Sequence, residues 1–232
     1  FQYNDKEVLT AHALAELDEA VDTAAPNVVI IILESTSASA VSLVEDRYRY
    51  PTSPFLKSLA KNSLVANNAY AIIPHTSKAL TAINCGVEPG LSRPIYASIL
   101  GVGVDCLPQL LSKKGYTSAF FQSPTGRFEN RKELISRYGF DDFYAMENID
   151  TDGFEVANYF GYEDRTLLKP SKEWLEKQEE PFLAVYLTGA THHDYIPPPS
   201  FETFEFLENS NVKDYNSYLN CIRYVDCFLA EL

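Results

Sequence analysis

The chain has 232 residues, of which 46% are hydrophobic and 13% aromatic, so it can bury the core of a sizeable domain and is not a disordered segment. Its net charge is −13 and it has no run of lysine and arginine, which argues against a nucleic-acid binder and against unassisted docking on an anionic surface. A small anionic substrate is still compatible with this charge, because a bound divalent metal can reverse the local field.

The first segment of the chain is acidic and rich in alanine and leucine, and we interpret residues 1–25 as a lead-in helix or linker. Residues 27–33 follow as a continuous, mostly β-branched run, which is typical of a strand covered on both faces. In chain order, the patterns then predict a helix at 54–60, a strand at 64–71, helices at 76–85 and 107–114, a strand at 116–122, helices at 130–138 and 163–178, a strand at 181–187 and a helix at 215–232.

Strands that alternate with helices in this way predict an α/β fold, with a mostly parallel sheet and helices on both faces. In such sheets ligands bind beyond the carboxyl ends of the strands. Polar residues follow the strands at 27–33, 116–122 and 181–187, and we expect them to meet at one edge of the sheet.

Glu34 is the first of these polar residues, and it directly follows six apolar residues. A carboxylate in that position is costly unless it is paired or bound to a metal. It could therefore be a metal ligand, or it could cap the loop or helix start at residues 35–37.

Thr76 lies where a helix is expected to begin. Its hydroxyl could cap that helix, which is the commonest use of threonine at such a place. It could also be a nucleophile that is activated by metal coordination, beside a helix N-terminus that favours a bound anion. The neighbouring His75 and Lys78 could stabilise a phosphate or could be solvated.

Arg131 and His192 are candidates for contact with a substrate. The guanidinium of Arg131 could fork onto an anionic oxygen, or it could form a surface ion pair with Glu129 or Glu133. His192 and His193 follow the last expected strand, and two histidines at such a strand end favour a functional role.

The chain has four cysteines, Cys85, Cys106, Cys221 and Cys227, which could pair in three ways that the sequence does not distinguish. Cys221 and Cys227 point to different faces of the expected last helix, so we do not expect them to pair with each other. No Cys-x-x-Cys motif is present, which argues against a structural zinc site. We favour buried thiols for all four.

Several stretches together resemble the sulfatase family of the alkaline phosphatase superfamily. Within it the resemblance is greatest to lipoteichoic acid synthases and related phosphoglycerol and phosphoethanolamine transferases. It runs from residue 26 to residue 232, which would be the N-terminal portion of a sulfatase-like catalytic domain. The matching stretches are residues 27–35, 75–78, 115–122, 128–131 (Phe-Glu-Asn-Arg), 138–144 and 191–195 (Thr-His-His-Asp-Tyr).

The resemblance implies a role for each candidate residue. Glu34 and Thr76 would be metal ligands, and Thr76 would attack the substrate and become covalently phosphorylated. Arg131 and His192 would contact the substrate, and we add Lys78 to this group. The implied cofactor is a divalent metal (Mn, Mg, Zn or Ca), and the implied substrate is a small anionic ester or a lipid- or glycan-linked phosphate.

The sequence departs from the family pattern in two places. Sulfatases carry Cys/Ser-x-Pro-x-Arg, whereas residues 74–78 read Pro-His-Thr-Ser-Lys, so we expect phosphate esters rather than sulfate esters as substrates. The family completes its metal site with an Asp-His dipeptide that this sequence does not contain. We therefore expect a fragment that is truncated before the C-terminal part of the fold, with an incomplete metal site and no activity by itself.

Three further expectations follow. A truncated sheet would leave an open edge through which the chain could self-associate. The family relationship implies an extracytoplasmic domain of a membrane-anchored parent protein. The alternatives to a phosphotransferase are a sulfuric ester hydrolase and a non-catalytic binding domain on the same scaffold.

Overall fold

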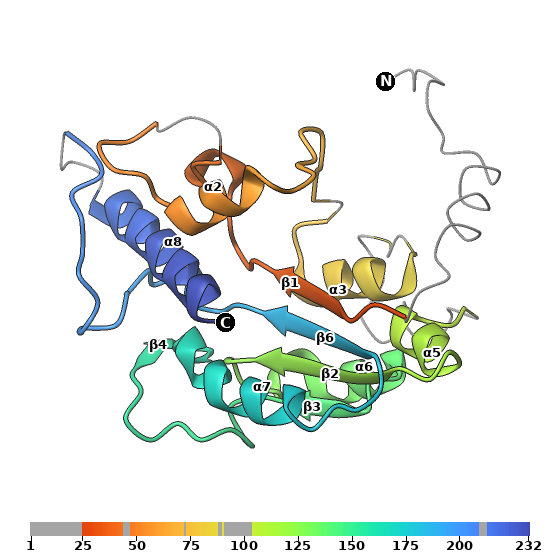
Figure 1. Cartoon of the computed structure of the whole chain (residues 1–232). Helices are drawn as coiled ribbons and strands as arrows, with labels where there is room; N and C mark the ends of the chain where they lie inside the picture. The colour runs from red at the N-terminus through yellow and green to blue at the C-terminus, as the bar shows by residue number, and fades with distance from the viewer. Residues whose placement is uncertain (1–24, 44–46, 72, 88–89, 91–103, 209–212) are drawn as a thin grey trace.

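The structure is a computed structural model that describes residues 25–43, 47–71, 73–87, 90, 104–208 and 213–232. Its centre is a parallel sheet, as predicted, and the structure shows the strand order β1-β6-β2-β3 (Figure 1). The strands are β1 (Val28–Ile32), β6 (Phe182–Leu187), β2 (Thr117–Gln122) and β3 (Asp142–Tyr144). A small antiparallel hairpin of β4 (Val156–Asn158) and β5 (Gly161–Tyr162) stands apart from this sheet.

Helices cover both faces of the sheet, which confirms the expected architecture. One face packs against α3 (Thr76–Cys85), α5 (Leu107–Ser112) and α6 (Arg131–Tyr138). The other face packs against α7 (Leu168–Leu175) and α8 (Lys213–Glu231), and α2 (Pro54–Ala60) lies against α8. Short 3-10 helices are η1 (Ala38–Ala40), η2 (Phe128–Asn130) and η3 (Asp164–Leu167).

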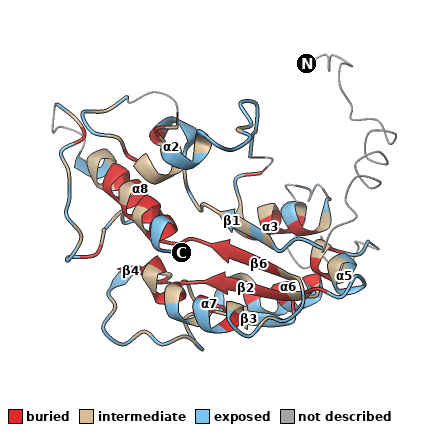
Figure 2. Ribbon diagram, viewed as in Figure 1, coloured by how far each residue is buried: buried red, intermediate tan, exposed pale blue. Residues whose placement is uncertain are grey.

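The core is densest on β2 and β6, where five of the six residues of each strand are buried (Figure 2). Alternate side chains of a strand point to opposite faces, so Phe120 and Val185 join the α3, α5 and α6 side. Phe121 and Tyr186 join the α7 and α8 side, where their rings stack with centroids 4.9 Å apart. These two central strands therefore bind the two helical layers together.

The expectation that residues 27–33 are covered on both faces was wrong. Val29 and Ile31 are 52% and 39% exposed, while the alternate side chains of β1 pack against the core. The reason is that β1 is an edge strand of the described sheet, and only one of its faces meets a helical layer.

Two other predicted elements were also wrong. No strand forms at residues 64–71, where Leu64 and Tyr70 are almost fully exposed and find no partner strand. The single helix expected at 163–178 is divided into η3 and α7. Pro170 explains the division, because proline lacks an N–H and clashes with the preceding turn, so it is tolerated only in the first turn of an α-helix. The short strands β3, β4 and β5 were not predicted.

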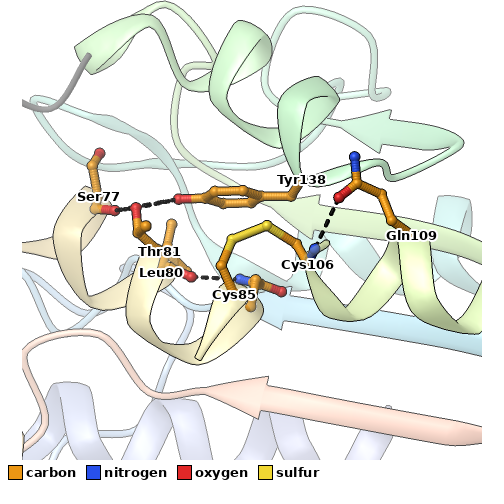
Figure 3. Close-up of a disulfide and its surroundings, with 8 residues drawn as sticks. Ser77, Leu80, Thr81, Cys85, Cys106, Gln109 and Tyr138 are labelled. Atoms are coloured by element: carbon orange, nitrogen blue, oxygen red, sulfur yellow. Dashed lines mark hydrogen bonds between the residues drawn. A yellow bond between two sulfur atoms is a disulfide. The ribbon is translucent and has the colours of Figure 1, made fainter. Parts of the chain in front are cut away.

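Cys85 and Cys106 form a disulfide, which corrects the expectation of four buried thiols. The bond joins the end of α3 to the residue that precedes α5 (Figure 3). Cys221 and Cys227 are free, as expected, and burial raises the pKa of the Cys221 thiol to about 12.

The proposed lead-in helix or linker at residues 1–25 lies almost entirely outside the described residues. Among the described helices, none combines the length and apolar character that crossing a bilayer requires.

We predict that removal of the disulfide destabilises the fold. The bond closes a loop with a sequence separation of 21 residues, for which chain entropy gives about 3 kcal/mol. The double variant Cys85→Ser/Cys106→Ser should therefore unfold at a clearly lower denaturant concentration than the wild type. The control is Cys227→Ser, which removes a free thiol. Equal midpoints for the double variant and the control would contradict the prediction.

Candidate active site

A pocket opens at the carboxyl ends of β1, β2 and β6, where the sequence predicts a site. Because these strands are parallel, the chain leaves all three at the same edge of the sheet. We call it the site pocket, and its lining residues are Glu34, Thr76, Gln122, Pro124, Thr125, Phe128, Arg131, Phe160, Leu187, Thr188, Gly189 and His192.

Glu34 and Thr76 meet at the centre of the site pocket. The Thr76 hydroxyl donates a hydrogen bond to Glu34 Oε1 at 2.9 Å, across 42 residues of sequence. Thr76 does not cap α3, because the N-cap residue is His75 and Thr76 is the first helical residue. Its hydroxyl is therefore directed at the carboxylate instead of the helix backbone.

The backbone around Glu34 is held in place by three hydroxyl groups. The Glu34 amide donates to the hydroxyl of Thr188 at 3.1 Å, and the hydroxyl of Thr191 donates to the Glu34 carbonyl. The Tyr218 hydroxyl donates to the carbonyl of Ser35 at 2.9 Å, and Ser35 has a left-handed φ of 50°. These contacts fix the direction of the chain as it leaves β1.

Arg131 is buried in the wall of the site pocket, with an exposed fraction of 4%. Its Nη1 lies 3.4 Å from the amide oxygen of Gln122, its Nη2 lies 3.8 Å from a carboxylate oxygen of Glu129, and its Nε has no hydrogen-bond partner among the described residues. Burial lowers the pKa of this guanidinium, although Glu129 and Glu34 both act to raise it. A buried cation with an unpaired N–H is suited to an anionic ligand.

His192 forms part of an aromatic wall of the site pocket. Its ring centroid lies 4.4 Å from that of Phe160 and 5.7 Å from that of Tyr159, both in edge-to-face geometry. Phe128 packs edge-to-face on Phe160 at 4.7 Å. His193, in contrast, is exposed and pairs with its neighbour Asp194.

Lys78 is the one predicted site residue that does not line the site pocket. It is buried, and its ammonium donates a hydrogen bond to the carbonyl of Gly90 at 3.1 Å. Its assignment as a substrate contact therefore stays a prediction.

Asp164 is buried and bonds the segments that follow β2 and β6, and it was not identified from the sequence. Its carboxylate accepts hydrogen bonds from Ser123 Oγ at 2.6 Å and from the amides of Gly189 and Ala190 at 2.7 and 3.1 Å. It thus ties the ends of β2 and β6 together beneath the loop that carries His192. Burial raises its pKa to about 6, and the three hydrogen bonds act in the opposite direction.

The donor set at the centre of the pocket fits part of a metal site. Two ligands on adjacent positions of an octahedral ion with bonds of about 2.1 Å lie about 3 Å apart, and the Glu34 and Thr76 oxygens are separated by 2.9 Å. Both are hard oxygen donors, which suit Mg or Mn. No cluster of three or more His, Cys, Asp or Glu side chains suited to a metal occurs among the described residues.

The sequence identified Glu34, Thr76, Arg131 and His192, and the structure brings all four to one pocket. It missed the aromatic wall from Phe128 and Phe160, and it missed Glu129 and Tyr218 as supporting groups. Gln122, which lines the pocket and contacts Arg131, was also not singled out. Its position at the end of a predicted strand was the one signal in the sequence that could have identified it.

Comparisons with known proteins point to one family. The Sulfatase family model matches residues 26–232. Lipoteichoic acid synthase from Staphylococcus saprophyticus is 28% identical over 126 residues, which are 54% of this chain and 19% of that protein. Lipoteichoic acid synthase 2 from Bacillus subtilis is 26% identical over 173 residues, which are 73% of this chain and 26% of that protein. The chain thus spans about a quarter or less of these relatives.

Solved structures share the fold. The lipoteichoic acid synthase LtaP from Listeria monocytogenes superposes with a TM-score of 0.78 at 20% identity, over 89% of this chain and 50% of that one. The phosphoglycerol transferase GacH from Streptococcus pyogenes, in complex with sn-glycerol-1-phosphate, gives 0.61 at 16% identity over 93% and 59%. The periplasmic domain of EptC from Escherichia coli, in complex with Zn, gives 0.65 at 23% identity over 90% and 58%. At these identities the likeness concerns the fold alone.

We predict that Asp164 makes stability depend on pH. Its pKa in the folded protein is about 6 against an ordinary value of 3.8. Its stabilising contribution is therefore complete below about pH 4 and is lost as the pH rises through about 6, by up to about 3 kcal/mol. The unfolding free energy of the wild type minus that of Asp164→Asn should fall by this amount from pH 4 to 7.5. The exposed Asp152→Asn is the control, and a difference independent of pH for Asp164→Asn would contradict the assignment.

Proposed function

This chain belongs to the sulfatase family, and from that premise we propose that it is the N-terminal portion of the catalytic domain of a metal-dependent enzyme. The enzyme would transfer or hydrolyse phosphate esters of the phosphoglycerol type through a covalent threonine intermediate. The observation that carries the proposal is the hydrogen bond of 2.9 Å from the Thr76 hydroxyl to Glu34, beside the buried Arg131.

The proposed nucleophile is Thr76 Oγ1. Its hydrogen is directed at Glu34 Oε1, so the oxygen lone pairs are free to face the pocket. A divalent cation held by Glu34 and Thr76 would supply a Lewis acid that acidifies the threonine hydroxyl and polarises the phosphoryl group. Attack of Oγ1 on phosphorus would form the Thr76–phosphate bond as the bond to the departing alcohol breaks, and an acceptor alcohol or water would then release the group.

Arg131 is the proposed anchor for the phosphate. Its guanidinium lines the pocket, where a planar cation with several N–H donors suits an anionic oxygen. The N-terminus of α3 adds a favourable field for the same anion, because Thr76 is the first residue of that helix. His192 and the aromatic wall would contact the remainder of the substrate.

The substrate class rests on the relatives. They include lipoteichoic acid synthases and a phosphoglycerol transferase that is described in complex with sn-glycerol-1-phosphate. We propose a small anionic ester or a lipid- or glycan-linked phosphate as the substrate. The lack of Cys/Ser-x-Pro-x-Arg at residues 74–78 disfavours sulfate esters.

An extracytoplasmic location with a membrane-anchored parent is part of the proposal. The Cys85–Cys106 disulfide supports it, since disulfides persist in oxidising compartments. Among the structural neighbours is a domain described as periplasmic. Self-association through an open edge of the sheet also stays a prediction, which sedimentation of the 232-residue chain would test.

We predict that Thr76→Ala reduces turnover of a phosphate ester by at least about 10³-fold in the whole protein, because the variant lacks the attacking oxygen. Thr76→Ser should retain part of the activity, since it keeps the hydroxyl. The matched control is Thr203→Ala on the exposed surface. Unchanged turnover by Thr76→Ala would overturn the proposed nucleophile.

A second prediction concerns the chemical class of the reaction. With matched nitrophenyl phosphate and nitrophenyl sulfate esters, the whole protein should act on the phosphate ester and lose that activity in a chelator. Preference for the sulfate ester would instead support the sulfuric ester hydrolase. Because Glu34 and Thr76 are the two metal ligands that we assign to this chain, we expect the 232-residue chain by itself to bind Mn²⁺ weakly and to be inactive. A whole protein that binds the ester but never turns it over would support a non-catalytic binding domain.

A further inference from the structure

Glu129 lies beside the site pocket and joins two of its walls. Its carboxylate contacts α3 on one side and approaches Arg131 on the other. We propose that Glu129 is a positioning residue, which holds the first turn of α3 so that Thr76 faces Arg131. The proposal rests on the proposed function, because it takes Thr76 as the nucleophile and Arg131 as the phosphate anchor. Glu129 would set the distance between these two residues.

The contacts of Glu129 bracket Thr76 in the sequence. Glu129 Oε1 lies 3.1 Å from Nε2 of His75, and Oε2 accepts a hydrogen bond of 2.5 Å from the hydroxyl of Ser77. His75 and Ser77 are the residues immediately before and after Thr76, so one carboxylate fixes both sides of the nucleophile.

The same carboxylate approaches the phosphate anchor. Glu129 Oε2 lies 3.8 Å from Nη2 of Arg131, and the Glu129 side chain is 19% exposed. This charge compensates part of the cost of burying the guanidinium, and it acts to raise the pKa of Arg131 against the effect of burial. Glu129 thus links the nucleophile turn and the anchor within one group of contacts.

The backbone at Glu129 is held in an uncommon conformation. Glu129 and Asn130 have consecutive left-handed φ angles of 50° and 51°. Such residues cost of order 1 kcal/mol each and persist where surrounding contacts determine them. Here the result is that the chain turns sharply before α6, which directs the Glu129 side chain to α3 while Arg131 begins the helix.

The rest of α3 is fixed independently of Glu129. The hydroxyls of Thr81 and Tyr138 lie 2.6 Å apart in the middle of the helix, and the disulfide from Cys85 to Cys106 secures its end (Figure 3). Loss of the Glu129 carboxylate should therefore leave α3 docked and release its first turn alone. A change confined to the first turn of α3 would therefore indicate a positioning role, and a change along the whole helix would indicate general support of the fold.

Glu129→Ala in the whole protein tests the proposal. We expect kcat for a nitrophenyl phosphate ester to fall by about 10- to 100-fold, because a misplacement of about 1 Å can cost 10²-fold. KM should stay equal or fall, since Arg131 remains and is released from its internal partner. Glu129→Gln, which keeps an oxygen acceptor for Ser77, should recover part of kcat.

The matched control is Glu133→Ala. Glu133 is exposed, lies on α6 and pairs with Arg137 at 2.9 Å, so the variant removes a carboxylate four residues away from Glu129 without touching α3. Its kcat and KM should match the wild type.

A second measurement does not depend on catalysis. Hydrogen exchange of the whole protein without substrate should be faster in Glu129→Ala than in Glu133→Ala for the amides of residues 79–81, which donate to the carbonyls of residues 75–77. It should be unchanged for residues 83–85. If Glu129→Ala does not fold, Ser77→Ala removes one of the two contacts and is judged by the same two measurements.

The outcomes separate this proposal from the proposed function. A wild-type kcat in Glu129→Ala, with Thr76→Ala inactive, would overturn the positioning role and leave the nucleophile in place. A loss in kcat/KM that comes from a raised KM would also overturn it, because that would show a role in substrate binding. Hydrogen exchange that increases along all of α3 would overturn it as well, because that would show general support of the fold. If Thr76→Ala is fully active, the proposed function fails, and the exchange at residues 79–81 alone decides whether Glu129 positions this turn.

Discussion

The parallel register of β1, β6 and β2 is the constraint on which the rest of the structure depends. Ile32 pairs with Leu187, and Leu187 pairs with Gln122, so the three strands end at one level. The chain must leave each strand at the same edge, which places Glu34, Ser123 and Thr188 near one another although they are far apart in the sequence. The buried aromatic and aliphatic side chains of β2 and β6 maintain this register, because a shift by one residue would move them to the wrong face.

The site is built from hydroxyl and carboxylate groups that join these strand ends to the helices. Thr188 and Tyr218 hold the backbone on either side of the Glu34 turn, while Asp164 holds the loop after β6. Each of these bonds is buried or half-buried, where an unpaired polar group would be costly, so the network specifies a single arrangement. The catalytic pair that we propose is thus held in place by Thr188, Tyr218 and Asp164, to which we assign no step of the reaction.

The family relationship and the geometry contribute different things. Membership of the sulfatase family accounts for the fold, and the class of chemistry is what we propose from the relatives. The geometry shows which side chains of this chain converge, namely Glu34 and Thr76 with Arg131 buried beside them. The role of Glu129 comes from the geometry, because only the structure shows that its carboxylate contacts His75 and Ser77.

The sequence by itself determined the fold class and the central strands, because strand burial and helix periodicity leave a direct pattern in the order of apolar residues. It made Glu34 and His192, which follow strands, and Thr76 and Arg131, which begin helices, candidates for a site. The roles proposed for these four residues came from the family resemblance. Only the tertiary structure decided that β1 is half-exposed, that Cys85 pairs with Cys106, and that Glu129 contacts both His75 and Ser77. Those features depend on sheet order and on a left-handed backbone before α6, and neither leaves a periodic signal in the sequence.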